Sequence, residues 1–169
     1  MQKAFTLIEI IIVIMIMSLF AGVGFNTYTK QIQEKQLDTT VEAYVTAIRL
    51  ARERAISRDL SVDQSCTQFN RYFVRSYTST NPDSYQSRFD CLQPALKTTY
   101  ATVNLKNNIS FTNVPGDTTV SFYPPLGCTS AGCDAGDYSV TFKNSAINKC
   151  KRVVINQLGN TSVSDTPCT

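Results

Sequence analysis

The sequence of 169 residues contains no histidine, and this absence excludes several kinds of site. Without an imidazole there is no Ser–His or Cys–His couple to activate a nucleophile, and no zinc site of the mixed Cys/His kind. The chain also lacks a C-x-x-C pair, a G-x-G-x-x-G segment and a P-loop. We therefore expect a protein that is not an enzyme and that holds no cofactor and no metal.

The six cysteines are even in number, and all of them follow an N-terminal apolar run. A domain on the oxidising side of a membrane would pair them, whereas a cytosolic domain would more often use them for metal binding or catalysis. Disulfides are the favoured interpretation, and the connectivity stays open. Nearest-neighbour pairing is the first expectation: Cys66–Cys91, Cys128–Cys133 and Cys150–Cys168.

Two acidic residues close to Cys133 were weighed as calcium ligands. Asp134 and Asp137 lie in the segment CDAGD. A calcium site needs about six to eight oxygen ligands, so this pair is too sparse. A turn beside the cysteine is the favoured interpretation.

Basic residues are missing between Lys3 and Lys30, and the 21 residues from Phe5 to Phe25 are apolar or uncharged except for Glu9. As a helix, this run measures about 31 Å, which matches the core of a bilayer. A simple anchor oriented by Lys3 does not explain Glu9, because an acid within a spanning helix is costly, by about 2.5–3.5 kcal/mol at the centre and less near an end. Cleavage between Ala4 and Phe5 would create a free amine on Phe5, four residues from Glu9. The carboxylate could then meet its own amine or that of a neighbouring molecule.

The segment MQKA followed by FTLIE resembles the class III signal of type IV pilins and pseudopilins. The resemblance implies that a prepilin peptidase cuts before Phe5 and that the new amine is methylated. It also implies that Glu9 pairs with the N-terminus of an adjacent subunit during filament assembly. Before assembly, the apolar helix would span the bacterial inner membrane once, with the rest of the chain outside the cytoplasm. Ala4 stands where the family usually has glycine.

The helix is expected to continue well beyond the apolar run. No proline precedes Pro82, and no glycine lies between Gly24 and Gly116. We predict one helix from about Phe5 to Arg58, roughly 80 Å long. Its second half has one apolar face, at Val41, Tyr44, Val45, Ile48, Ala51, Ala55 and Ile56. Its arginines alternate with acidic residues, which favours a solvated face or subunit contacts over nucleic-acid binding.

Beyond Leu60 the pattern changes to short runs rich in β-branched and aromatic residues. Strands are predicted at 71–77, 99–105, 118–124, 137–143, 152–156 and 161–163, with loops at 79–86 and 127–137. The predicted fold is α+β, with antiparallel strands on the amphipathic half of the helix. The organisation is a leader at 1–4, an apolar helix at 5–29 and a pilin-like domain at 30–169. That domain comprises an amphipathic helix at 30–58 and a β domain at 61–169.

A finer resemblance, to the GspH/FimT-type subgroup, rests on residues 41–62, 120–127, 137–142 and 152–163. It implies a minor pilin of a type IV pilus or a minor pseudopilin of type II secretion, which helps to initiate or cap the filament. The sequence does not decide which machine it serves. The alternative is a tip-exposed module for DNA uptake or surface adhesion.

Some FimT-like members bind DNA through a C-terminal Gly-Arg-x-Arg motif, and the corresponding stretch here runs from Gly159 to Ser162 without either arginine. The remaining candidates for a weak DNA contact are Lys149, Lys151 and Arg152. For these three residues, a solvated strand entry beside Cys150 is the favoured interpretation.

Overall fold

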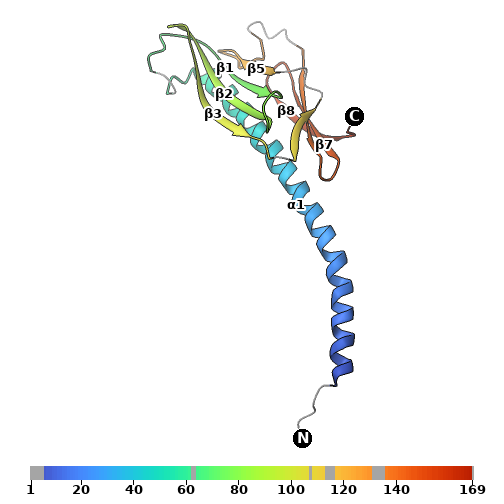
Figure 1. The fold of residues 1–169 in the computed structure, drawn as a ribbon. Helices are drawn as coiled ribbons and strands as arrows, with labels where there is room; N and C mark the ends of the chain where they lie inside the picture. The colour runs from blue at the N-terminus through green and yellow to red at the C-terminus, as the bar shows by residue number, and fades with distance from the viewer. Residues whose placement is uncertain (1–5, 62–63, 107, 113–116, 131–135, 169) are drawn as a thin grey trace.

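The computed structural model describes residues 6–61, 64–106, 108–112, 117–130 and 136–168, and for residues 19–26 the backbone alone. One helix, α1, runs from Leu7 to Ser57 and confirms the long helix that the absence of proline, and of glycine after Gly24, predicts. It ends at Arg58, which adopts the left-handed conformation with φ 52°. Figure 1 shows the N-terminal part of α1 extending away from the domain, and its C-terminal part lying against strands.

The β domain consists of two four-stranded antiparallel sheets. The first has the order β3-β2-β1-β5 and the second the order β4-β6-β7-β8. The first sheet contains β1 (Gln68–Tyr77), β2 (Ser84–Gln93), β3 (Leu96–Asn104) and β5 (Thr118–Phe122). The second contains β4 (Ile109–Thr112), β6 (Tyr138–Asn144), β7 (Lys149–Ile155) and β8 (Thr161–Thr166). The α+β, pilin-like fold is thereby confirmed.

The sequence patterns did not predict the strands β2 and β4. The loop predicted at 79–86 is wrong from Ser84 onward, because β2 begins there. Its sequence SYQSRFDCLQ contains no valine, isoleucine or threonine, so its β-propensity is low. It does alternate, since Tyr85, Phe89 and Cys91 are buried in the core. Burial against Tyr44 of α1 and against the rings of β1 therefore outweighs the weak propensity.

The core begins where α1 reaches the sheets. The buried stripe of the helix comprises Leu37, Val41, Tyr44, Val45, Ile48, Ala51 and Ala55. This is the predicted apolar face with Leu37 added. Ile56, which was predicted on that face, is instead 42% exposed, because it lies in the last turn at the rim of the domain.

Disulfides whose two cysteines both lie among the described residues close loops at Cys66–Cys91 and at Cys150–Cys168. Both are nearest-neighbour pairs. Cys128 is also disulfide-bonded, and its expected partner Cys133 lies outside the described residues.

Candidate functional site

The N-terminal part of α1 presents a continuous apolar surface to solvent. Every large hydrophobic side chain from Leu7 to Met17 is at least 44% exposed, and Leu7 reaches 77%. Soluble monomers rarely expose an apolar patch of this extent unless it binds something. Among the helical residues that the structure describes, none forms a stretch long and apolar enough to cross a membrane.

Glu9 lies in the first turn of α1 and is held by the residue that begins the helix. Its Oε2 accepts hydrogen bonds from the backbone N–H and the hydroxyl of Thr6, each at 3.0 Å. A carboxylate is favoured there, because the first backbone N–H groups of a helix carry a partial positive charge. Ala4 and Phe5, the predicted cleavage site, lie outside the described residues. The Thr6 contact was missed in the sequence, although T-x-x-E at a helix start is a known capping pattern.

At the neck of the molecule, where α1 enters the domain, the helix contacts the second sheet through polar groups. We use the name neck cluster for Gln33, Glu34 and Asp38 of α1 together with Asn144, Lys149 and Lys151. Lys149 forms an ion pair with Glu34, while Lys151 Nζ lies 2.6 Å from Asp38 Oδ1. Asn144 Nδ2 donates to the backbone carbonyl of Gln33 at 3.0 Å.

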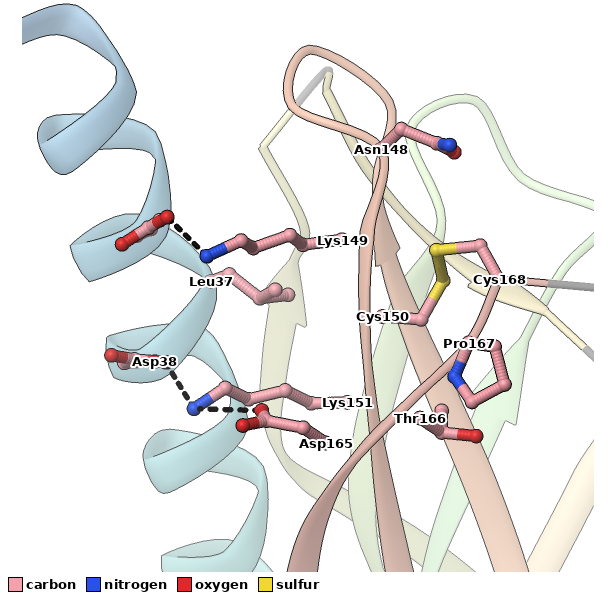
Figure 2. Close-up of a pocket in the computed structure, with 11 residues that line it drawn as sticks. Leu37, Asp38, Asn148, Lys149, Cys150, Lys151, Asp165, Thr166, Pro167 and Cys168 are labelled. Carbon is pink, nitrogen blue, oxygen red and sulfur yellow. Dashed lines mark hydrogen bonds and ion pairs between the residues drawn. A yellow bond between two sulfur atoms is a disulfide. The ribbon is translucent and has the colours of Figure 1, made fainter. Parts of the chain in front are cut away.

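Figure 2 shows that Lys149 and Lys151 reach from β7 across to α1, beside a hollow of about 380 Å³. Lys151 Nζ also lies 3.6 Å from Asp165 of β8. The hydrogen bond to Asp38 raises the pKa of Lys151 above its usual value. The Cys150–Cys168 disulfide forms another side of this hollow.

The three cations that were candidates for DNA contact are thus not equivalent. Lys149 and Lys151 face α1 and are paired with carboxylates. Arg152 is exposed on β7 and points to the opposite side, because neighbouring residues of a strand alternate between its two faces. The structure does not bring the three side chains together into one basic patch.

The hairpin that joins β7 to β8 lies against arginines of α1. Gly159 has φ 75°, and a Cβ atom there would come within 2.7 Å of Arg52 Cδ. Arg49 Nε donates to the hydroxyl of Thr161 at 3.3 Å. Positive charge at this hairpin therefore comes from the helix rather than from the hairpin itself. Of the acidic pair weighed as calcium ligands, Asp137 is exposed and Asp134 lies outside the described residues.

Comparison with known families finds one match. A family model described as the prokaryotic N-terminal methylation motif matches residues 1–25. Comparisons with curated proteins and with solved structures give no significant match. The motif covers the predicted cleavage site, Glu9 and most of the exposed apolar surface.

Proposed function

We propose that this chain, a type IV pilin-like protein by its methylation motif and its fold, is a minor structural subunit of a type IV pilus or of a type II secretion pseudopilus. It would help to initiate or cap the filament, in keeping with its resemblance to GspH/FimT-type subunits. Its partners would be other pilin or pseudopilin subunits and the prepilin peptidase. We propose no enzymatic activity and no cofactor.

The observation that carries the proposal is the division of α1 into two halves. From Leu37 onward the apolar side chains of the helix are buried by the sheets. From Leu7 to Met17 they are exposed over the whole circumference of the helix. Such a surface gains free energy from any apolar surroundings. Lipid would surround it in the bacterial inner membrane, with the domain outside the cytoplasm, and the apolar helices of neighbouring subunits would replace the lipid in the filament.

Processing supplies the partner for Glu9. Cleavage between Ala4 and Phe5, followed by methylation, would leave a cationic amine on Phe5. A neighbour's amine would then compete with Thr6 for the Glu9 carboxylate. The amine carries a full positive charge and would form an ion pair with the carboxylate, which the neutral Thr6 hydroxyl cannot do, so the amine would replace the hydroxyl. The two disulfides support a location outside the reducing cytoplasm.

The test is the substitution Glu9→Ala in the full chain, with incorporation into sheared filaments as the readout. We expect incorporation to fall at least about tenfold, the factor that corresponds to a loss of ~1.4 kcal/mol. Glu42→Ala is the matched control, because it removes the same exposed acid from the docked half of α1.

The control variant should be incorporated like the unmodified chain. Incorporated material should have a mass that corresponds to a methylated Phe5 start. Wild-type incorporation of Glu9→Ala, or an intact Met1 in the filament, would overturn the proposal.

A further inference from the structure

Each of the two sheets ends in an outer strand whose free edge faces solvent. Among the strands that the structure describes, β3 pairs only with β2, and β8 pairs only with β7. Seven of the nine residues of β3 and four of the six residues of β8 are exposed, whereas the outer strands β4 and β5 contain no exposed residue. Figure 1 shows β3 as the outermost strand on its side of the first sheet. A free edge offers N–H and C=O groups to a strand of another chain.

The register of β3 shows which of its backbone groups point outward. An antiparallel ladder alternates between residue pairs that exchange hydrogen bonds and pairs that do not. Leu105 N–H donates to the Asp83 carbonyl at 2.7 Å, so these two residues form a hydrogen-bonded pair. Three residues earlier, Thr102 pairs with Gln86 in a position without such bonds. The N–H and C=O of Thr102 therefore point away from β2.

The same rule applies to β8. Asn156 N–H donates to the Asn160 carbonyl at 3.0 Å, and this bond continues the ladder between β7 and β8. Val163 pairs with Val153 in a position without hydrogen bonds, so its N–H and C=O point away from β7. We call the outward sides of these two strands the β3 edge and the β8 edge.

The strand β3 runs along α1 toward the neck. In the middle of β3, the guanidinium of Arg54 lies 4.7 Å from the centre of the Tyr100 ring. Further along, Val103 pairs with Tyr85, whose ring contacts Tyr44. As β3 advances, it therefore passes from the last turns of α1 to earlier ones.

The strand β8 runs in the same direction on the opposite flank of α1. It begins at Thr161, whose hydroxyl accepts a hydrogen bond from Arg49 at 3.3 Å. It then reaches Asp165, which shares Lys151 with Asp38. Arg49 and Arg54 lie about 140° apart around the helix, since five residues advance it by nearly one and a half turns. The β3 edge and the β8 edge therefore flank α1 on opposite sides.

Both edges expose a valine at about the same height along α1. Val103 of β3 is 39% exposed and belongs to the level of Tyr44. Val163 of β8 is 47% exposed and lines a hollow with Val41 and Val45. If the two edges met, these apolar side chains would lie at matching levels and cover each other.

Closer to the neck, the two edges carry opposite charges. Lys106 is exposed just after β3, and Asn108, two residues on, is hydrogen-bonded to Gln33. The side chain of Asp165 is 86% exposed at the level of Asp38. Gln33 and Asp38 are within about two turns of each other on α1. Lys106 therefore matches Asp165 in height and has the opposite charge.

We propose that the β3 edge pairs in parallel with the β8 edge of a second copy of this chain that stands beside it in the same orientation. Because both strands run toward the neck, this arrangement keeps the emerging halves of α1 on one side. Two β3 edges related by a twofold axis would pair antiparallel and point these halves in opposite directions, which anchoring in one membrane excludes. The inference goes beyond the filament role, and only the choice of orientation rests on the anchoring proposed above.

The contact uses different edges of the two copies, so it is head-to-tail and can continue from copy to copy. A ladder of six residues buries less area than the roughly 1,200–2,000 Å² of stable complexes. We therefore expect the copies to associate when they share a membrane, which raises their effective concentration.

The test uses the full chain in phosphatidylcholine vesicles, prepared from equal amounts of unlabelled and nitrogen-15-labelled copies. A carbodiimide joins a lysine amine to a carboxylate in contact with it. Mass spectrometry should find Lys106 coupled to Asp165 in pairs that carry one labelled and one unlabelled peptide. Lys151 and Asp165 of the same chain, 3.6 Å apart, should be coupled without mixed labels and serve as the internal control.

Proline at an outward position blocks an edge without removing a bond from the sheet itself. Thr102→Pro blocks the β3 edge, and Val163→Pro blocks the β8 edge. Each variant alone should lower the coupling between copies at least about fivefold, the effect of one lost hydrogen bond. The matched controls Thr102→Val and Val163→Thr keep the N–H and should be coupled like the unmodified chain.

A mixture of the two proline variants identifies the direction of the contact. With Val163→Pro labelled and Thr102→Pro unlabelled, the labelled copies keep the β3 edge and the unlabelled copies keep the β8 edge. Labelled Lys106 should therefore be coupled to unlabelled Asp165, and the reverse combination should be at least about fivefold rarer. Equal amounts of the two combinations would overturn the inference.

A comparison within the unmodified chain decides the matter if a proline variant has a lowered thermal midpoint. Lys97 is exposed at the other end of β3, so parallel pairing keeps it away from Asp165 of the second copy. Coupling of Asp165 to Lys97 should be at least about fivefold rarer than coupling to Lys106. Equal coupling of the two lysines, or an absence of mixed labels, would overturn the inference. The vesicles contain no filament, so either result leaves the test of the filament role independent.

Discussion

Tyr44 is the residue at which α1 meets both sheets. Its ring packs edge-on against Tyr85 of the first sheet, with centroids 5.2 Å apart. It also contacts Phe142 at 5.2 Å and Phe111 at 6.2 Å in the second sheet. Its hydroxyl lies 3.2 Å from the Ser76 hydroxyl, so the one polar atom of a fully buried side chain has a partner. Tyr44 thereby contacts both sheets from one position of the helix.

Burial of Tyr44 makes the stability of the domain sensitive to alkaline pH. Desolvation raises the pKa of Tyr44 from 10.0 to about 12. Because the folded state holds this proton more tightly than the unfolded state, the contribution is complete below the unfolded pKa and is lost as pH rises toward the folded pKa. The free energy of unfolding should therefore fall between about pH 10 and pH 12.

Tyr44→Phe should remove part of that fall. Between about pH 8 and pH 11, urea unfolding should show a decrease about 1.4 kcal/mol smaller in the variant than in the unmodified domain. At about pH 8 the variant should be less stable by about 1–2 kcal/mol, because Ser76 loses its partner. Tyr72, whose pKa is also raised to about 12, leaves a remaining alkaline dependence in both proteins. Identical pH profiles would contradict the assignment to Tyr44.

At the scale of elements, the neck cluster determines where α1 leaves the sheets. Its ion pairs join residues more than a hundred positions apart, since Lys149 and Glu34 are separated by 115 residues. Lys151 pairs with both Asp38 and Asp165 and is partly buried. The cluster thus attaches the last β-hairpin to the first docked turns of the helix.

A double-mutant cycle should measure this attachment. Lys151→Met and Asp38→Asn, combined in the domain, should show a coupling of about 0.2–1 kcal/mol at low salt. The coupling should shrink at high salt, because both side chains are partly exposed to screening ions. The pair Arg75 and Asp117 of the first sheet, at 3.1 Å, gives a matched cycle away from the helix. A coupling that does not respond to salt would show that packing rather than charge holds the neck.

The sequence predicted those parts of the fold and of the site that a local residue pattern specifies, and it did not predict contacts between distant segments. The helix was predicted because proline is absent over its whole length and glycine is absent after Gly24, and β6 because Tyr138, Val140 and Phe142 alternate with polar residues. β2 was missed because Ser87 interrupts the apolar alternation of Tyr85, Phe89 and Cys91. The partners of Lys149 and Lys151 were out of reach, because no local pattern records a contact between α1 and β7.

At the scale of the whole molecule, Figure 1 shows a domain from which half of a long helix emerges. The core draws on the helix from Leu37 onward, and the neck cluster begins at Gln33. Nothing described before Gln33 contributes a buried apolar side chain to the domain. The described side chains of the emerging half therefore take no part in the core, and the docked half serves the fold.

Two truncations should separate these roles. A chain that starts at Lys30 keeps the neck cluster and Leu37, so it should unfold cooperatively with a free energy of about 5–15 kcal/mol. A chain that starts at Thr40 loses Leu37, which is 1% exposed, along with the helix partners of Lys149 and Lys151. Removal of one buried leucine costs about 2–5 kcal/mol, and the lost ion pairs add to this. Urea unfolding followed by far-UV circular dichroism measures the free energy of unfolding of both chains.

Equal stability of the two chains would mean that the fold does not depend on the neck cluster. A chain that starts at Lys30 and fails to fold would mean that the emerging half of α1 is part of the domain.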